Sequence, residues 1–294
     1  MTTRPPLPAM LNGLAELAEL HDVFLVDQFG VLHDGRKPYP GAVEALSRLK
    51  KAGKTVVILS NSGKRARPNE TRLAGLGFDP SSWDLFLSSG EAAWRRFAGL
   101  AGQPALKPGT RCLLIARDND KSAVEGLGFE LVDRDPDLVL ISASEGNRVA
   151  LEAYAELLAS PARAGVPCFC TNPDKVMLVG AQTFFGAGQI AELYESLGGK
   201  VTWIGKPFPE IYKVALSGLR GADPSRIVAI GDSVEHDIAG AKGIGLAAAL
   251  VRTGILAEMD EQALDEVFHK NGARPDYLLS GFQWQGKEPR AATG

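Results

Sequence analysis

The sequence has few of the features that mark secreted or membrane proteins. It contains three cysteines, Cys112, Cys168 and Cys170, an odd number, and the Cys-x-Cys pair has no histidine at metal-ligand spacing, which argues against a disulfide framework and a zinc site. No apolar run is long enough to cross a membrane, and the N-terminal MTTRPPLPAM lacks the apolar core of a signal peptide. We therefore expect three buried thiols in a reducing, cytoplasmic compartment.

Neither sign of charge is in excess. With 32 Lys and Arg against 35 Asp and Glu, the net charge of −3 gives no electrostatic reason to expect nucleic acid or an anionic membrane as a partner. The chain also lacks internal repeats, and disorder is expected only for its C-terminal KEPRAATG. Its 294 residues, of which 45% are hydrophobic, are enough for two domains.

A strand, a helix and a second strand are predicted near the N-terminus. The apolar run DVFLVDQ at 22–28 predicts a strand, and GAVEALSRLKKAG at 41–53 predicts an amphipathic helix that ends at Gly53. The apolar TVVILSNS at 55–62 predicts the next strand. This order indicates a right-handed βαβ unit in a parallel sheet, and the nearly all-apolar strands indicate that helices cover both faces.

The same alternation continues to the C-terminus. RIVAIGDS at 226–233 and LAAALVRTG at 246–254 predict strands around a short helix, and PDYLLS at 275–280 predicts a late, outer strand. Between the halves, a helix is expected from Asn119, and further strands and helices are expected at 111–117, 138–144, 147–160 and 167–174. We predict an α/β protein, with a Rossmann-like, doubly wound parallel-sheet core at 1–89 and 186–294 and a smaller α/β cap domain inserted at 90–185.

Four polar segments follow apolar strands, and the carboxyl ends of parallel strands are where ligands bind. They carry, in chain order, Asp27, Ser60, Lys206, and Asp232 with Asp237. Carboxylates that converge on one edge repel each other unless a cation lies between them, and hard oxygen ligands favour Mg²⁺. A carboxylate can attack phosphorus, while a lysine and a hydroxyl neutralise phosphoryl oxygens. The residue types therefore indicate metal-assisted phosphoryl chemistry.

This arrangement resembles the haloacid-dehalogenase superfamily, in particular its class IIA phosphatases, over most of the chain. The segments that carry the resemblance are Asp27-Gln28-Phe29-Gly30-Val31, Pro40-Gly41-Ala42, Ser60-Asn61-Ser62, Thr171-Asn172-Pro173-Asp174, Gly205-Lys206-Pro207, and Gly231-Asp232 through Asp237. The position of the inserted module, between the second and third of the family's motifs, is also similar.

The resemblance implies a role for each of these side chains. Asp27 would be the nucleophile and a metal ligand, and Phe29 would offer the metal its backbone carbonyl. Asp232 would bind Mg²⁺ directly, and Asp237 would help directly or through water. Ser60, Ser62 and the Asn61 backbone would hold phosphate oxygens, and Lys206 would lower the negative charge shared by Asp27 and the phosphoryl group.

The resemblance also implies the wider function. We expect a Mg²⁺-dependent phosphohydrolase that acts on a small phosphorylated metabolite through an aspartyl-phosphate intermediate. The inserted module would exclude water and select the substrate. A homodimer through that module is a family-level expectation. Cleavage of a carbon–halogen or carbon–phosphorus bond ranks lower, because Ser60 and Lys206 suit a phosphate better than a halide.

One position departs from the family pattern. The second aspartate of the first motif, which is the family's general acid and base, is replaced by Phe29. General acid–base assistance contributes about 10²–10⁴ in rate. Either His33 or Asp34 replaces it, or the substrate has a good leaving group, or the protein reacts once or only binds metal and phosphate. That last reading, a catalytically impaired binding protein, is the alternative function.

A glycine-rich segment mimics a dinucleotide-binding fingerprint. Gly186-Ala187-Gly188 precedes a helical pattern, but the next strand ends in Gly205-Lys206 and supplies no acidic residue for a ribose. We interpret the glycines as a structural entry from the cap back to the core.

Overall fold

The computed structural model describes residues 8–180, 182–219 and 221–285, so the C-terminal KEPRAATG lies outside the described residues. Contacts divide the chain into two compact units. The first comprises residues 1–59, 70–86 and 215–294, and the second comprises residues 60–69 and 87–214. In the part of the chain that the structure describes, no helix combines the length and apolar character needed to cross a bilayer.

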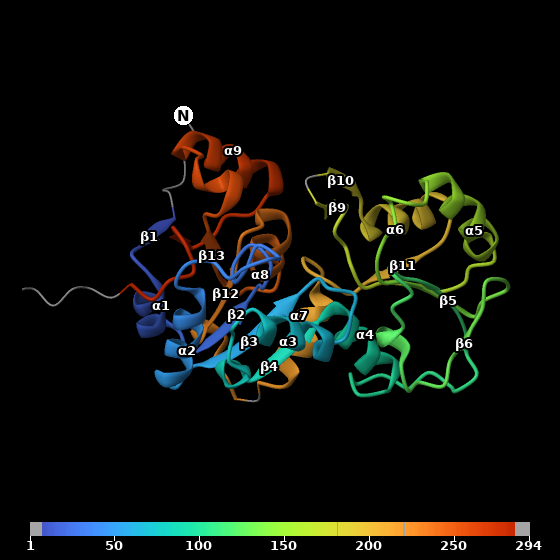
Figure 1. Ribbon diagram of the computed structural model, residues 1–294, viewed down its shortest axis with the longest axis horizontal. Helices are drawn as coiled ribbons and strands as arrows, with labels where there is room; N and C mark the ends of the chain where they lie inside the picture. Colours follow the sequence, from blue (N-terminus) through green and yellow to red (C-terminus); the bar gives the residue numbers. More distant parts are fainter. Residues whose placement is uncertain (1–7, 181, 220, 286–294) are drawn as a thin grey trace, which may run out of the picture. The chain divides into compact units, whose positions relative to one another are not determined.

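A seven-stranded sheet is centred on the first unit (Figure 1). Its strand order is β1-β14-β13-β12-β2-β3-β4, and every pair from β1 to β3 is parallel. The strands are β1 (Ala9–Leu11), β2 (Val23–Val26), β3 (Thr55–Ser60), β4 (Leu85–Ser88), β12 (Ile227–Gly231), β13 (Ala247–Val251) and β14 (Tyr277–Leu279). The order runs outward from β2 through β3 to β4 and from β12 through β13 to β14. The topological switch point, where such sheets bind ligands, therefore lies between β2 and β12.

Apolar side chains fix the three adjacent strands β12, β2 and β3. Phe24 and Val26 of β2, Ile58 of β3 and Ile230 of β12 are at most 1% exposed, as expected for a sheet covered on both faces. Val26 lies opposite Ile58 on one side and opposite Ile230 on the other. This register brings the residues that follow β2, β3 and β12 to the same edge of the sheet.

Helices connect these strands. They are α1 (Leu14–Leu20), α2 (Ala42–Lys51), α3 (Ala66–Gly75), α7 (Pro209–Ser217), a π-helical turn at Val234–Ile238, α8 (Ala239–Gly243) and α9 (Glu261–Asn271), with 3-10 turns at Pro80–Ser82, Pro224–Arg226 and Gly254–Ala257. Helix α2 is amphipathic. It buries one face, through Ala42, Ala45, Leu46 and Leu49, and its last turn carries basic residues, which suit the negative end of the helix dipole.

The second unit has its own parallel sheet, of strand order β11-β8-β7-β5-β6, and an antiparallel hairpin, β9-β10. Its elements are α4 (Ser89–Phe97), β5 (Arg111–Ile115), a 3-10 turn at Ser122–Val124, β6 (Glu130–Leu131), β7 (Leu138–Ile141), α5 (Leu151–Arg163), β8 (Cys168–Cys170), β9 (Val176–Val179), β10 (Gln182–Phe185), α6 (Ala187–Ser196) and β11 (Val201–Trp203). Helix α6 packs through Ile190 and Tyr194 into the same apolar cluster as α5 and β7.

The predicted fold class is confirmed, with two local corrections. The chain after Asn119 forms only the 3-10 turn at Ser122–Val124 instead of a helix, because Asp118 and Asn119 are both left-handed and Asp120 caps Ser122. Strand β14 is not the outermost strand, since the short β1 covers its free edge. The core-and-cap boundaries at 90 and 185 stay a prediction; α6 and β11, placed in the core by that prediction, pack in the second unit.

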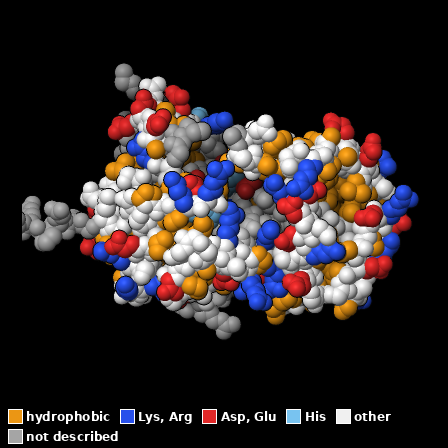
Figure 2. Space-filling view, in the orientation of Figure 1, with side chains coloured by type: hydrophobic (Ala, Val, Ile, Leu, Met, Phe, Trp, Pro, Cys, Tyr) orange, Lys and Arg blue, Asp and Glu red, His pale blue; other side chains and the backbone are white. Residues whose placement is uncertain are grey.

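The distribution of surface charge and the burial of the cysteines both match the expectations from composition. Acidic and basic side chains are intermixed on the face shown in Figure 2, as the near-neutral net charge leads one to expect. Cys112, Cys168 and Cys170 are all buried and free, so the expectation of three buried thiols is confirmed.

Candidate active site

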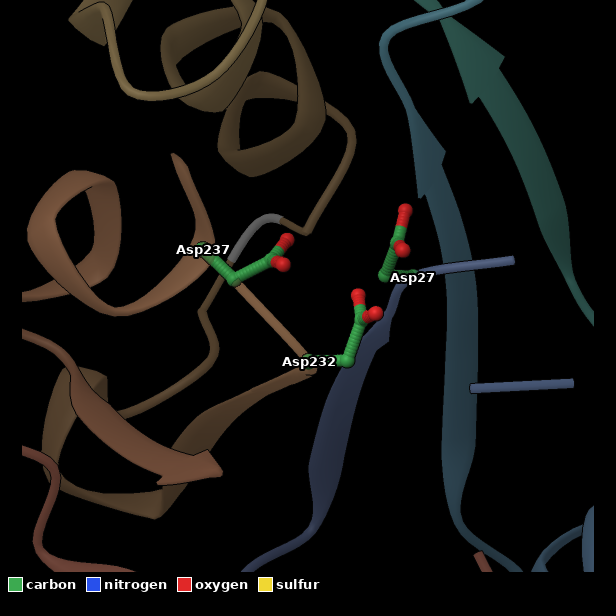
Figure 3. A group of neighbouring side chains, drawn as sticks. All are labelled: Asp27, Asp232 and Asp237. Carbon is green, nitrogen blue, oxygen red and sulfur yellow. The ribbon is translucent and has the colours of Figure 1, made fainter. Parts of the chain in front are cut away.

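Three carboxylates converge at the switch point of the larger sheet (Figure 3). Asp27 directly follows β2, Asp232 directly follows β12, and Asp237 lies in the π-helical turn after Asp232. One ligand oxygen from each of the three lies within 4.8 Å of the other two. The sequence prediction that these three side chains meet at one sheet edge therefore agrees with the geometry of the first unit.

Asp27 is held by the sheet itself. Its backbone N–H donates to the Ile230 carbonyl of β12 at 2.9 Å, which continues the β2–β12 ladder by one residue. The residue is 8% exposed. Asp27 therefore sits on a rigid strand end, as a reacting group requires.

Asp237 is oriented by a turn that folds back toward Gly231. The Asp237 N–H donates to the Ser233 carbonyl at 2.9 Å, and the Ser233 N–H donates to Asp237 Oδ2 at 3.1 Å. A Cβ on Gly231 would lie 2.0 Å from Asp237 Cγ. Only glycine at 231 therefore lets the 4%-exposed Asp237 carboxylate pass so close to the end of β12.

Gly30 has the same role toward Asp232. Its φ of +88° lies in the left-handed region, and a Cβ there would lie 2.0 Å from Asp232 Oδ2. The loop is fixed by two bonds: the Gly30 N–H donates to the His33 carbonyl at 3.0 Å, and Thr253 Oγ1 donates to the Gly30 carbonyl at 2.8 Å. Sequence reasoning missed Thr253, whose only sequence signal is its place just after strand β13.

The chemistry of these donors fits a hard divalent cation. All three side chains offer carboxylate oxygen, and three carboxylates so close together repel each other unless positive charge lies among them. The carbonyl of Phe29 belongs to the same loop as Gly30 and Asp27. Asp27, Asp232 and Asp237 are therefore the residues that could hold a metal ion.

Phe29 presents a phenyl ring where the family has an acid. Its side chain is 49% exposed, although one face is packed. The His33 ring lies perpendicular to it at 5.9 Å between centroids, and a Cβ on Gly35 would lie 3.1 Å from Phe29 Cε2. The Phe29 ring therefore packs against residues of its own loop.

The two predicted substitutes for the missing acid are both engaged with that loop. His33 is 1% exposed, and its Nδ1 accepts from the Gly35 N–H at 2.9 Å; burial, reinforced by Arg72, lowers the pKa of His33 to about 4. Asp34 Oδ1 accepts from the N–H groups of Arg36 and Lys37, and these bonds hold the pKa of Asp34 below its usual range. At neutral pH Asp34 is ionised, and the neutral His33 ring carries its proton on Nε2, for which the described residues supply no hydrogen-bond partner.

Tyr39 is a proton-bearing group that no sequence pattern singles out. Burial raises the pKa of Tyr39, and the nearby Asp232 carboxylate raises it further. Its phenol is therefore protonated at neutral pH and lies in the field of the carboxylate cluster.

Ser60 is the last residue of β3, and Asn61 and Ser62 follow it directly. The Ser62 N–H donates to Ser60 Oγ at 3.1 Å, and the Lys64 N–H donates to Ser62 Oγ at 3.3 Å. Ser60 and Asn61 are 3% and 9% exposed. This run of small polar residues has the character of a phosphate-binding turn.

Lys206 is 3% exposed, and its backbone is paired with the side chain of Asn61. The Lys206 N–H donates to Asn61 Oδ1 at 2.7 Å, and Asn61 Nδ2 donates to the Lys206 carbonyl at 3.1 Å. Asn61 Nδ2 also donates to Asp174 Oδ1 at 2.9 Å. The structure thus brings together two predicted phosphate-site residues with the Asp174 of the Thr-Asn-Pro-Asp segment.

Comparisons with known proteins agree with these features. Residues 24–130 match a family model described as haloacid dehalogenase-like hydrolase, and residues 203–283 match a second, described as HAD-hydrolase-like. The chain is 30% identical over 271 residues to D-glycerol 3-phosphate phosphatase of Mycobacterium tuberculosis, with 90% of this chain and 71% of the relative covered.

Solved structures give the same picture. A haloacid dehalogenase-like hydrolase from Brucella suis matches with a TM-score of 0.76 and 26% identity, and 92% of this chain and 99% of that chain are covered. Glycerol phosphate phosphatase from Mycobacterium tuberculosis in complex with magnesium matches with a TM-score of 0.70 and 28% identity, covering 90% of this chain and 77% of that one.

Proposed function

The chain belongs to the haloacid dehalogenase-like hydrolases, and from this premise we propose that it is a Mg²⁺-dependent phosphohydrolase that acts on a small phosphorylated metabolite. The family membership and the phosphatase names of its relatives make it a hydrolase of the phosphatase kind. We further propose that the ion is magnesium and that the reaction proceeds through an aspartyl phosphate.

One observation carries the proposal: the oxygens of Asp27, Asp232 and Asp237 meet within 4.8 Å at the switch point of the sheet. A strand-end carboxylate next to two others is the arrangement in which one acid attacks while the others hold a cation. The magnesium complex of a similar phosphatase supports the choice of ion.

The proposed reaction has two steps on Asp27. An Asp27 carboxylate oxygen attacks phosphorus, the bond from phosphorus to the leaving oxygen breaks, and its electron pair departs with the leaving group. Water then attacks the same phosphorus, the bond to Asp27 breaks, and inorganic phosphate leaves with Asp27 restored as a carboxylate. Mg²⁺ bound to Asp27, Asp232, Asp237 and the Phe29 carbonyl would neutralise negative charge on the phosphoryl oxygens.

Ser60, Ser62, the Asn61 backbone and Lys206 are proposed to bind those oxygens. The register of β2 and β3, in which Val26 lies opposite Ile58, supports the placement of Ser60 at the edge where Asp27 lies. For Lys206 the support is its charge, its burial and its place in the motif order of the family. An ammonium there would lower the charge shared by Asp27 and the phosphoryl group.

We extend the proposal to the inserted module, the oligomeric state and the cellular compartment. The inserted module at 90–185 would select the substrate, a homodimer would form through that module, and the three buried free thiols support a reducing, cytoplasmic setting.

Phe29 favours a second candidate function, a metal- and phosphate-binding protein that does not turn over. The phenyl ring cannot move a proton, and His33 and Asp34 are bound to their own loop. The two functions differ in one measurable property, which is turnover that depends on Asp27.

The test is a phosphatase assay with Mg²⁺ on 4-nitrophenyl phosphate and on a panel of phosphorylated metabolites that includes glycerol phosphate. The wild type is compared with Asp27→Asn and with Asp133→Asn, an exposed acid in the second unit that serves as the matched control. We expect wild-type and Asp133→Asn turnover that EDTA abolishes, and none in Asp27→Asn. Full activity in Asp27→Asn would refute the mechanism, and phosphate binding with no turnover in any form would establish the second function.

A further inference from the structure

Asn61 uses its side-chain amide on protein groups. The amide oxygen accepts the Lys206 N–H at 2.7 Å, and the amide nitrogen donates to the Lys206 carbonyl at 3.1 Å and to Asp174 Oδ1 at 2.9 Å. Both bonds to Lys206 are buried. One planar group thus holds both polar atoms of the Lys206 backbone, as a neighbouring strand would.

Asp174 fixes which way that amide points. A flipped Asn61 amide would set its NH₂ against the Lys206 N–H, and its oxygen against the Lys206 carbonyl and the Asp174 carboxylate. The bond to a carboxylate is of the stronger, charge-assisted kind. Asp174 therefore favours the single orientation in which Asn61 holds Lys206.

Asp174 is itself held in place by the glycines of the segment that resembles a dinucleotide fingerprint. The Gly188 N–H donates to the Asp174 carbonyl at 3.0 Å, and the Gly186 N–H donates to the Lys175 carbonyl at 2.7 Å. A Cβ on Gly186 would lie 2.0 Å from the Asp174 carbonyl oxygen. These glycines let the start of α6 hold Asp174, which accounts for the motif without a nucleotide.

The residue before Lys206 shows how tightly this arrangement is packed. A Cβ on Gly205 would lie 2.4 Å from Pro173 Cδ and 2.8 Å from Asn61 Oδ1. The backbone directly before Lys206 is therefore packed closely against Pro173 and the Asn61 amide.

We propose that Asn61 and Asp174 are positioning residues for Lys206, and that the Asn61 side chain does not bind the phosphoryl group. The proposal rests on the proposed function, in which the Lys206 ammonium contacts the phosphoryl oxygens. It assigns to the Thr-Asn-Pro-Asp segment a role in catalysis that acts through a lysine 32 positions further along the chain.

The test is a double-mutant cycle on 4-nitrophenyl phosphate hydrolysis, with single-turnover rates at high enzyme concentration so that slow variants are measurable. The variants are Asn61→Ala, Lys206→Ala and the pair. Asn69→Ala is the control, because Asn69 is another buried asparagine of the same unit, bonded to the Arg65 carbonyl. Circular dichroism and thermal melting check the fold of each variant.

We expect Asn61→Ala to lower the rate by about 10- to 100-fold, since a small misplacement of a catalytic group costs about that much. In the Lys206→Ala background the same change should alter the rate by less than about twofold, the scatter of uncoupled sites. Asn69→Ala should retain the wild-type rate. Equal losses in both backgrounds would overturn the proposal, because Asn61 would then act independently of Lys206.

Asp174 supplies a second cycle, which also serves if Asn61→Ala does not fold. Asp174→Asn keeps an oxygen that accepts a hydrogen bond from Asn61, so it should retain most of the rate. Asp174→Ala should lower the rate when Lys206 is present, but should leave the rate of Lys206→Ala unchanged. Equal rates for Asp174→Ala and wild type would contradict the proposal. A fully active Lys206→Ala would remove the proposed catalytic role of Lys206 and this inference, whereas a fully active Asp27→Asn would refute the nucleophilic mechanism itself.

Discussion

At the residue scale, Asp232 lies where a proposed metal ligand is expected. It is half-buried, follows β12 directly, and has an oxygen within 4.8 Å of oxygens of two other acids. A carboxylate in such a place costs free energy unless a cation compensates it. This makes the metal requirement of the protein sensitive to this one side chain.

We therefore predict that Asp232→Asn raises the Mg²⁺ concentration for half-maximal activity by at least about tenfold, because even residues behind the ligands are worth about 10–100-fold in metal proteins. Magnesium titration of phosphatase activity measures it, with Asp133→Asn as the exposed control. An unchanged midpoint would show that Asp232 is not a ligand.

At Phe29 the sequence predicts the loss of the general acid and base, and the structure shows what the neighbouring side chains do. Because His33 and Asp34 hold the loop, Phe29→Asp should raise the rate on alkyl phosphates, whose leaving groups need a proton, by about 10²–10⁴-fold. The rate on 4-nitrophenyl phosphate should rise less. Phe29→Asn removes the ring without adding an acid and should give no such rise. If Phe29→Asp is folded and gives no gain either, another group already supplies the proton, and Tyr39 is the first to test.

At the scale of the element, the loop after β2 depends on one glycine more than on any side chain. Gly30 combines a φ of +88° with the absence of space for a Cβ beside Asp232, whereas Gly53, at the end of α2, has a φ of +73° and nothing within 4 Å of a Cβ. Substitution of Gly53 therefore tests backbone strain alone, whereas substitution of Gly30 tests strain together with a steric clash at the site.

Gly53→Ala should lower the free energy of unfolding by about 1–2 kcal/mol, the cost of a left-handed alanine, and leave Mg²⁺ binding intact. Gly30→Ala should incur the same strain and also displace the Asp232 carboxylate, so that Mg²⁺-dependent activity falls by at least about tenfold. Urea unfolding and the magnesium titration check both. Equal Mg²⁺ midpoints for the two variants would mean that Gly30 does not shape the site.

Elements with a strong apolar pattern could be predicted from sequence, and those set by polar turns could not. Phe24 to Val26 and Val56 to Ile58 are continuous apolar runs between turn residues, so β2 and β3 follow directly from the sequence. The helix expected from Asn119 fails because two successive left-handed residues redirect the chain. Strand β1 was missed because its three residues are mostly exposed and carry no periodic signal.

The candidate site divides in the same way. Asp27 and Asp232 could be placed together because the carboxyl ends of neighbouring parallel strands share an edge. The bonds of the Asn61 amide could not be predicted, since they join residues 113 and 145 positions apart. No local pattern reports such a contact; only the folded chain shows it.

At the scale of the whole molecule, buried histidine links stability to pH. His21 is 3% exposed, lies edge-on to the Tyr277 ring, and has a pKa lowered by burial and, next, by Arg226. In the unfolded chain His21 has its ordinary pKa of 6.5, so it binds a proton at a higher pH than it does in the folded state. Stability from the neutral ring is therefore complete above about pH 6.5 and declines as the pH falls toward the folded pKa.

We predict that the free energy of unfolding of the wild type falls between pH 7.5 and pH 5.5 by up to about 1.4 kcal/mol per pH unit for each such histidine. His21→Phe keeps a ring against Tyr277 and removes the titration, so its slope should be smaller. Urea unfolding at several pH values measures both slopes. Identical slopes would show that His21 is protonated equally in the two states.

In the proposed catalyst, Asp27 attacks the phosphoryl group while Mg²⁺ and Lys206 neutralise its charge. A crystal structure of the wild type with Mg²⁺ and beryllium trifluoride, which mimics a phosphoryl group on a carboxylate, tests this most directly. We predict beryllium bonded to an Asp27 oxygen and the Lys206 ammonium on a fluoride. Mg²⁺ should be bound by Asp27, Asp232 and the Phe29 carbonyl, and by Asp237 directly or through water. A fluoride bound away from Asp27, or a Lys206 ammonium that does not reach it, would contradict the proposed catalyst.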